Sequence, residues 1–318
     1  MNKIRVAVIG AGVFGRHHLR VLSQSLNATL VGVVDSDPER AAMVAAEHNC
    51  RTFATLGELK GHVDAAVVAV PTSLHAEVGC ELLESSIDVL VEKPIAANLA
   101  SARLLVATAA KHERILQIGH LERFNPAVAA LKKITRIPLF FEIHRLSLFS
   151  PRSLDVDVVL DLMIHDLDIV LDLAGIMPEE IRAAGLSILS DKVDIANVRL
   201  AFPGGCVANL TASRVSTERV RKLRLFQPHQ YISLDYQKQD AVAFTVSGNQ
   251  EIGFQPLPVV KEEPLRLEVE SFLKAVANRS RPLVPGEDGL RALEVALAIL
   301  DKIEEHAKLV TQTLQSLT

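Results

Sequence analysis

The chain is poor in cysteine and carries little surplus charge. Its three cysteines, Cys50, Cys80 and Cys206, lie far apart and lack the paired spacing of zinc or redox sites. The net charge is only −4 with 23% charged residues, which argues against a nucleic-acid-binding surface. No apolar run has the length of a membrane span, and the first residues run straight into a strand pattern without the features of a signal peptide. These absences lead us to expect a protein of the reducing cytoplasm.

The length of the chain and the order of its apolar segments predict two domains. A chain of 318 residues exceeds the size at which a single core usually stops growing. In the first part, strand-like runs alternate with helical patterns, which predicts a parallel sheet with right-handed crossovers. The runs lie at residues 4–9, 30–34, 65–70, 89–91 and 115–118, and the helical patterns at 17–25, 38–49, from 73–75 onward and at 100–111.

After residue 120 the strand-like runs follow one another with few helices between them, which predicts a mostly antiparallel sheet. They lie at residues 139–148, 181–189, 198–202, 206–213, 222–226 and 231–236. Helices are expected at 126–133, 265–277 and 289–309, with a turn at 282–286. We therefore expect an α/β chain with a parallel-sheet domain over residues 1–120. An α+β domain with an open sheet should follow over residues 121–318, with terminal helices that can pack back on the first domain.

The first strand runs directly into a glycine-rich turn, Gly10-Ala11-Gly12-Val13-Phe14-Gly15. Such a turn between a strand and a helix, with Asp35 standing 20 positions after Gly15, is typical of a Rossmann dinucleotide-binding domain. The glycines let the backbone approach a pyrophosphate, and the amides at the helix start receive its charge. Asp35 is placed to bind the ribose hydroxyls and to repel a 2′-phosphate, so NAD is expected, although Arg16 weakens the distinction from NADP. The alternative is a glycine turn with an unrelated surface aspartate.

A second candidate element is Glu92-Lys93-Pro94, which follows the fourth predicted strand. Ligands bind at the carboxyl ends of parallel strands, so Lys93 is expected to face the cleft. Pro94 restricts Lys93 to an extended backbone, and a cis peptide bond would suit this position. The alternative is a solvated lysine paired with Glu92.

A third element is the segment 161–168 within an apolar stretch over residues 156–173 that reads as a buried helix. Asp161, His165 and Asp168 are expected to share one face of it. Burying three ionisable groups is costly unless they pair with one another or face a polar cavity. A core histidine with its hydrogen bonds satisfied is the alternative, and no metal is expected because a further ligand at suitable spacing is missing.

These elements, in this order, resemble the Gfo/Idh/MocA family of oxidoreductases. The resemblance covers nearly the whole chain and extends to Pro71-Thr72-Ser73-Leu74-His75 and to the segment 282–298. It implies that Lys93 and His165 lie beside the nicotinamide and the reacting hydroxyl. It also implies that Val13, Phe14, Pro71, Thr72, His75 and Glu92 belong to the cofactor site, and that a homodimer or homotetramer forms through the open face of the second sheet.

A narrower likeness lies in residues 119–126, 212–216 and 219–236, which are similar to the branch of this family that oxidises the C3 hydroxyl of UDP-N-acetylglucosamine. It implies an NAD-dependent dehydrogenase of a UDP-N-acetyl-hexosamine whose product feeds amino-sugar and lipid A synthesis. Alternative substrates are a free polyol or an N-acetylglucosaminuronic acid nucleotide. A non-catalytic NAD-binding regulator is a further alternative, against which the presence of both Lys93 and His165 counts.

In the expected reaction, a hydride passes from the sugar to NAD and the hydroxyl proton passes to Lys93 or His165. We expect the two residues to share a proton relay, and which of them is the direct base stays open. Asp161 would orient His165 or bind a sugar hydroxyl. Near the domain junction, His120, Arg123 and Asn125 are candidates for contacts with substrate or nicotinamide, with a purely structural junction as the alternative.

The segment 214–224 gathers basic side chains in an otherwise mildly acidic chain. They are Arg214, Arg219, Arg221, Lys222 and Arg224. A guanidinium from this group, with Arg214 as the first candidate, is suited to bind the diphosphate of a nucleotide-sugar. The alternative is a solvated hairpin or a set of salt bridges at a subunit interface.

Overall fold

The computed structural model describes residues 3–149, 156–246 and 251–317. They form two compact units, each with its own core. The first unit consists of Met1–Leu121 and Glu263–Leu290, and the second of Glu122–Glu262 and Arg291–Thr318. Among the described residues, no helix combines the length and the apolar character that crossing a membrane requires.

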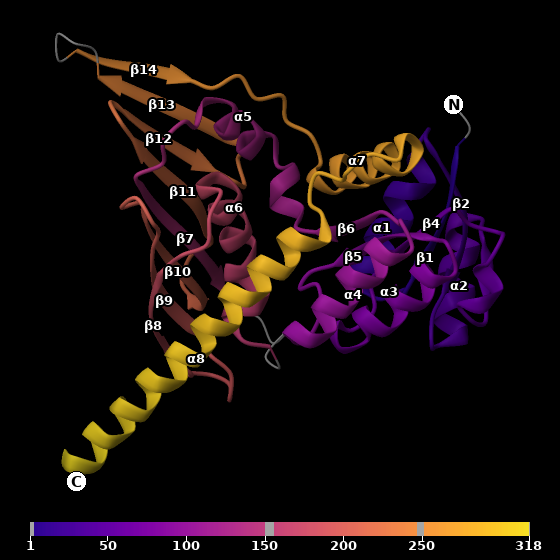
Figure 1. The fold of residues 1–318 in the computed structure, drawn as a ribbon, viewed down its shortest axis with the longest axis horizontal. Helices are drawn as coiled ribbons and strands as arrows, with labels where there is room; N and C mark the ends of the chain where they lie inside the picture. The colour runs from indigo at the N-terminus through magenta and orange to yellow at the C-terminus, as the bar shows by residue number, and fades with distance from the viewer. Residues whose placement is uncertain (1–2, 150–155, 247–250, 318) are drawn as a thin grey trace. The chain divides into compact units, whose positions relative to one another are not determined.

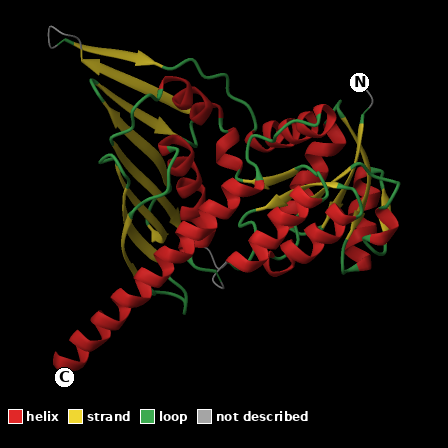
Figure 2. Ribbon diagram, viewed as in Figure 1, coloured by secondary structure: helices red, strands yellow, loops and turns green. Residues whose placement is uncertain are grey.

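The first unit contains a six-stranded sheet in which every strand pair is parallel, as expected (Figure 2). The strand order is β3-β2-β1-β4-β5-β6, which is the Rossmann order. The strands are β1 (Ile4–Ile9), β2 (Ala28–Val34), β3 (Arg51–Phe53), β4 (Ala65–Val68), β5 (Asp88–Glu92) and β6 (Leu116–Gly119). Strand β3 was not predicted, because it is short and only its last residue is buried.

Helices cover both faces of this sheet. They are α1 (Val13–Gln24), α2 (Pro38–His48), α3 (His75–Glu84), α4 (Leu99–Lys111) and α7 (Pro264–Asn278), with short 3-10 turns at Gly57–Leu59 and Thr72–Leu74. Apolar side chains of α1, α2 and α7 share one core with the sheet, while α3 and α4 pack against each other. Helix α7 thus belongs to the first unit, although it comes after every strand of the second unit in the sequence (Figure 1).

The second unit contains an eight-stranded sheet in the order β14-β13-β12-β11-β7-β10-β9-β8. All its pairs are antiparallel except β7 with β10, which confirms a mostly antiparallel sheet. The strands are β7 (Phe140–Leu148), β8 (Glu180–Leu186), β9 (Ile195–Ala201), β10 (Val207–Ser216), β11 (Val220–Gln227), β12 (Gln230–Asp235), β13 (Asp240–Val246) and β14 (Ile252–Pro256). The prediction missed β13 and β14, since β13 buries only small alanines and β14 is exposed throughout.

One face of this sheet is covered by helices and the other is not (Figure 1). The covering helices are α5 (Pro126–Ile134), α6 (Ile164–Ala174) and α8 (Gly286–Leu317), preceded by the 3-10 turn Leu121–Phe124 and a π-helical turn at Val159–Met163. Helix α8 begins in the first unit, continues in the second, and is longer than predicted. The open face carries a row of aromatic rings in contact, Phe140, Phe226, Tyr231, Phe244 and Phe254.

Candidate functional site

The glycine turn after β1 is packed so closely that two of its positions exclude a side chain. Gly10 has φ +93°, and a Cβ there would lie 2.6 Å from the Ala69 carbonyl oxygen. A Cβ on Gly15 would lie 1.8 Å from the Gly10 carbonyl oxygen. At Gly12, by contrast, a Cβ would meet nothing within 4 Å, so the backbone faces open space there. This is the arrangement that a pyrophosphate approaching the backbone requires.

The first amides of α1, like those of any helix, have no partner within the helix and can serve such a ligand. Gly12 is its N-cap and supplies no side-chain hydrogen bond, and no acidic residue stands in the first turn. A helix N-terminus of this kind favours an anion. Beside it, the apolar side chains of Val13 and Phe14 are 61% and 58% exposed. The free amides, the open backbone and this apolar surface fit a bound dinucleotide.

Asp35 at the end of β2 is already engaged by the protein. Its Oδ2 accepts a hydrogen bond from Ala11 N at 2.6 Å. Its Oδ1 accepts from Asp37 N at 2.8 Å and from Arg40 Nη2 at 2.6 Å. Burial acts to raise the pKa of Asp35, but these hydrogen bonds and the charge of Arg40 hold the pKa below its ordinary value. The carboxylate therefore ties the glycine turn to the end of β2, and its contact with a ribose stays a prediction. Its neighbour Arg40 was not indicated by the sequence.

The loop after β4 supports the backbone around Lys93. Pro71 is exposed and Thr72 half-buried, whereas His75 is buried. The His75 ring has Nδ1 2.9 Å from the Pro94 carbonyl oxygen and Nε2 2.9 Å from the Val70 carbonyl oxygen. Burial lowers the pKa of His75. His75 thus joins the exit of β4 to the Lys93–Pro94 peptide bond, which is cis.

Lys93 is half-buried, and the acid beside it turns inward. Glu92 Oε1 lies 2.7 Å from His18 Nε2, and Glu92 Oε2 accepts a hydrogen bond from Lys93 N at 3.3 Å. Burial acts to raise the pKa of Glu92, but the hydrogen bond from His18 and the charge of Lys93 lower it overall. Only 13% of the Glu92 side chain is exposed. The alternative of a solvated pair of Lys93 with Glu92 therefore does not hold for the Glu92 carboxylate.

The helical element of the second unit differs from the expected buried helix over residues 156–173. The helix begins only at residue 158, and a π-helical turn over Val159–Met163 precedes α6. Asp168 is buried, whereas Asp161 and His165 are half-buried, so this segment is not the fully buried helix that was expected. That the three side chains share one face stays a prediction.

A buried cluster of charges around Arg145 in this unit was not predicted from the sequence. Arg145 on β7 donates from Nε and Nη2 to Asp166 at 2.7 and 2.8 Å, and from Nη1 to Glu122 at 2.9 Å. Its guanidinium also lies 5.1 Å from the ring centre of Tyr236. Burial acts to lower the pKa of Arg145, but the two carboxylates raise it well above its ordinary value. The sequence did contain a signal for this. Side chains alternate between the two faces of a strand, so Arg145 on β7 falls on the same inward face as Phe141 and Ile143.

Residues near the domain junction are held by neighbouring side chains. Arg123 is 4% exposed and lies 3.4 Å from Asp168 and 3.0 Å from Asp172. The Asn125 amide donates to Glu122 and to the Tyr236 carbonyl, and its oxygen caps α5 at Ala127 N. These contacts give Arg123 and Asn125 a structural role, and their contact with substrate stays a prediction. His120 in the first unit is likewise buried.

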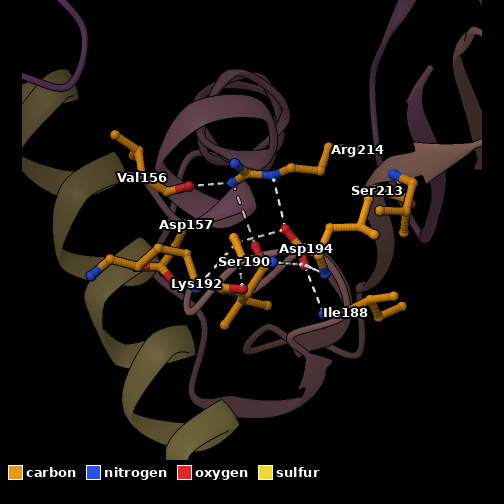
Figure 3. A network of polar contacts seen from close by, with 11 residues as sticks. Val156, Asp157, Ile188, Ser190, Lys192, Asp194, Ser213 and Arg214 are labelled. Carbon is orange, nitrogen blue, oxygen red and sulfur yellow. Dashed lines mark hydrogen bonds and ion pairs between the residues drawn. The ribbon is translucent and has the colours of Figure 1, made fainter. Parts of the chain in front are cut away.

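The basic segment 214–224 divides into buried and exposed members. Arg214 is 7% exposed, donates to the Val156 carbonyl, and has Nε 3.6 Å from Asp194 Oδ1 (Figure 3). Asp194 in turn accepts hydrogen bonds from the amides of residues 188–190. Arg224 pairs with Glu142 at 3.0 Å, whereas Arg219 is exposed. The structure thus gives Arg214 a role in holding the loop before β9, which the sequence did not reveal.

A parallel Rossmann sheet with a tightly packed glycine turn, followed by an α+β unit with an open sheet, is an architecture typical of nicotinamide-dependent oxidoreductases. Residues 4–120 match the model described as "Oxidoreductase family, NAD-binding Rossmann fold", and residues 145–228 match the GFO/IDH/MocA C-terminal domain. The chain belongs to the Gfo/Idh/MocA oxidoreductase family. The expected cofactor, NAD, is thereby confirmed, as is the expected class of enzyme, an oxidoreductase acting on CH–OH groups.

Two relatives show how far this likeness extends. UDP-N-acetylglucosamine 3-dehydrogenase of Acidithiobacillus ferrooxidans is 36% identical over 310 residues, covering 96% of this chain and 98% of the relative. The solved structure of that enzyme superposes with a TM-score of 0.91 over 96% of this chain and 99% of that chain. Inositol 2-dehydrogenase of Rhizobium meliloti is 25% identical over 331 residues, covering 96% of this chain and 98% of the relative.

Proposed function

We propose that this enzyme oxidises the C3 hydroxyl of a UDP-N-acetyl-hexosamine, with UDP-N-acetylglucosamine as the first candidate, and passes the hydride to NAD. The observation that carries the proposal is the whole-length likeness to an enzyme of that name at 36% identity. The pattern of Lys93 and His165 in a chain with an intact glycine turn supports a catalytic rather than a regulatory role. The alternatives are a free polyol or an N-acetylglucosaminuronic acid nucleotide as substrate.

The chain's own part in the reaction is to bind, orient and accept a proton. NAD, when bound, accepts the hydride. The Gly10–Gly15 turn and the start of α1 would hold its pyrophosphate, and Asp35 its ribose. Lys93 and His165 would share the hydroxyl proton, one of them as the direct base, with Asp161 orienting His165. His75 and Glu92 would act by fixing the backbone at Lys93 and Pro94.

The diphosphate of the substrate requires a cation. Because Arg214 is engaged with Val156 and Asp194, Arg219 is the better candidate of the two for direct contact. R219A should then raise KM for a UDP-sugar. R214A should instead loosen the loop that contains Asp194, because it removes the side chain that holds this loop. We also propose residues 1–120 as the cofactor domain and residues 121–318 as the substrate and oligomerisation domain.

We propose that the chain oligomerises through the open face of the second sheet. The helices do not cover this face, and the row of aromatic rings from Phe140 to Phe254 lies on it. Phe226 and Phe254 are 37% and 63% exposed in one chain, which suits contact with a second copy as a homodimer or homotetramer. We place the reaction in the cytoplasm and its product among precursors of amino-sugar and lipid A synthesis.

The test is incubation with NAD and a panel of UDP-sugars, free polyols and the uronic acid nucleotide, followed by mass spectrometry. We expect formation of NADH together with a UDP-N-acetyl-hexosamine product that is lighter by two hydrogens. Turnover of only a polyol or the uronic acid nucleotide would replace the substrate assignment. Binding of NAD without reduction by any member of the panel would favour the regulator.

A further inference from the structure

Behind Lys93, the core of the first unit holds three ionisable side chains from three elements. His18 comes from α1, Glu92 from the end of β5 and Glu268 from α7. One nitrogen or oxygen atom of each lies within 4.8 Å of the others. The neighbour of Glu92 on β6 is a glycine, which leaves room for the carboxylate: a Cβ on Gly119 would lie 3.1 Å from Glu92 Oε2, a tight contact.

Glu268 is the unusual member of this cluster. It is 0% exposed, and neither of its carboxyl oxygens has a hydrogen-bond partner among the described residues. Burial, aided by repulsion from Glu92, raises the pKa of Glu268 well above its ordinary value. A raised pKa favours the protonated form of the carboxyl group, which has one O–H to donate. His18 Nδ1 also lacks a hydrogen-bond partner within the described part of the chain.

A buried acid with unsatisfied oxygens carries a cost that a methionine or leucine of similar size would avoid. Simple filling of space therefore does not explain it. A metal ion explains it poorly too. His18 Nε2 and Glu92 Oε1 are 2.7 Å apart, a hydrogen-bond distance, whereas two ligands on one tetrahedral zinc ion stand roughly 3.3 Å apart. A hydrogen bond between His18 and Glu92 therefore fits this distance better than a metal ion bound by both.

We propose that Glu268, buried within 4.8 Å of the His18–Glu92 pair, is a positioning residue for Lys93: its carboxyl group donates a hydrogen bond to that pair when it moves into range, and so holds the Glu92 carboxylate against the Lys93 backbone. The pair itself connects to Lys93, because Glu92 Oε1 lies 2.7 Å from His18 Nε2 and Glu92 Oε2 accepts a hydrogen bond from Lys93 N. Glu268 does not touch the substrate in this account. The inference rests on the proposed function insofar as Lys93 serves the oxidation.

The test compares E268Q, which mimics the neutral acid, with E268M, which fills the space but donates no hydrogen bond. We expect E268Q to keep wild-type kcat, and E268M to lose about tenfold in kcat with NAD affinity unchanged. The matched control is E270M on the same helix, where Glu270 binds Ser25 and Asn27 away from the cluster. E270M should leave kcat unchanged.

Two readouts do not depend on the substrate. The infrared spectrum of wild type at neutral pH should contain the carbonyl band of a protonated carboxylic acid, and E268Q should lack it. Methylation of the Lys93 amine by formaldehyde and borohydride should be faster in E268M than in wild type or E268Q. If both hold while no UDP-sugar is turned over, the proposed function fails and the positioning of Lys93 by Glu268 stands.

Three results would overturn the inference. The first is wild-type kcat and wild-type Lys93 methylation in a folded E268M. The second is a severe loss of kcat in E268Q together with the absence of the carboxylic acid band, which would mean that Glu268 is ionised. The third is one zinc ion per chain, found by elemental analysis of wild type and lost in E268Q.

Discussion

Each unit has a buried cluster of ionisable side chains, and the two clusters are paired to very different degrees. In the second unit, Arg145 meets Asp166 and Glu122 through three hydrogen bonds of 2.7 to 2.9 Å. In the first unit, Glu268 lies buried beside Glu92 with neither oxygen hydrogen-bonded to any described residue. A fully paired buried cluster supports the fold, whereas an underpaired one is maintained at a cost and indicates a role in function. The underpaired cluster is the one that lies directly behind Lys93.

The largest effect that separates the two clusters should come from R145M. It leaves Asp166 and Glu122 as buried charges without their partner, which should lower the free energy of unfolding by about 3–5 kcal/mol. Urea denaturation measures this. R224M is the control on the neighbouring strand, because the exposed pair of Arg224 with Glu142 should contribute no more than about 1 kcal/mol. Equal losses in the two variants would contradict a structural role specific to Arg145.

On the functional side of the comparison, K93M and H165N should each lower kcat by about 10²- to 10⁴-fold, because each removes a group that moves the hydroxyl proton. NAD affinity and the urea midpoint should stay close to wild type, unlike in R145M. Steady-state kinetics and fluorescence titration of NADH give these values. Near wild-type turnover in either variant would remove that residue as the acid or base.

A smaller effect is expected at Asp35, whose buried carboxylate has protein partners and is proposed to bind the ribose as well. D35A should weaken NAD binding by about 10- to 100-fold, since hydrogen bonds to a charged group contribute about 1.5–3 kcal/mol. It should weaken NADP binding less, because the charge that repels the 2′-phosphate is gone. R40M keeps the carboxylate and removes one of its partners, so it should preserve the preference for NAD. An unchanged ratio of the two affinities in D35A would show that Asp35 does not contact the ribose.

The last effect concerns the pH dependence of stability, and it accumulates over a range of pH. Glu268 faces His18 and Glu92, and its pKa is raised in the folded state, so the folded protein binds a proton that the unfolded chain releases above its own pKa of about 4.3. Its contribution is complete below that value and is lost as the pH rises toward the folded pKa. Relative to wild type, E268Q should therefore gain up to about 1.4 kcal/mol of stability per pH unit in that window. A constant difference between pH 5 and pH 8 in urea titrations would contradict a neutral Glu268.

The sequence predicted best what depends on local patterns. The glycine turn, the parallel strands and the position of Lys93 after β5 follow from runs of neighbouring residues. Strand β14 was missed because it has only five residues, of which Gly253 and Pro256 are poor strand formers, and all five are exposed. The π-helical turn before α6 was missed because an apolar helix pattern does not reveal one extra residue in a turn.

The buried clusters could not be predicted, because their members meet only in the folded chain. Arg145, Asp166 and Glu122 come from a strand, a helix and a 3-10 turn. Glu268 reaches Glu92 from a helix that follows the entire second sheet. Likewise, Arg214 looked like a surface cation until its contacts with Val156 and Asp194 were known. Arg40 lies only five residues from Asp35, yet a lone arginine on a helix gives no sign of its partner.

The central claim is hydride transfer from C3 of the sugar to NAD, and its most direct test uses UDP-N-acetylglucosamine carrying deuterium at C3 only. The account predicts that the deuterium appears in the NADH formed, with none left in the sugar product, as read by mass spectrometry of both molecules. NADH without deuterium, with the label kept in the oxidised sugar, would contradict it and would place the oxidation at another carbon.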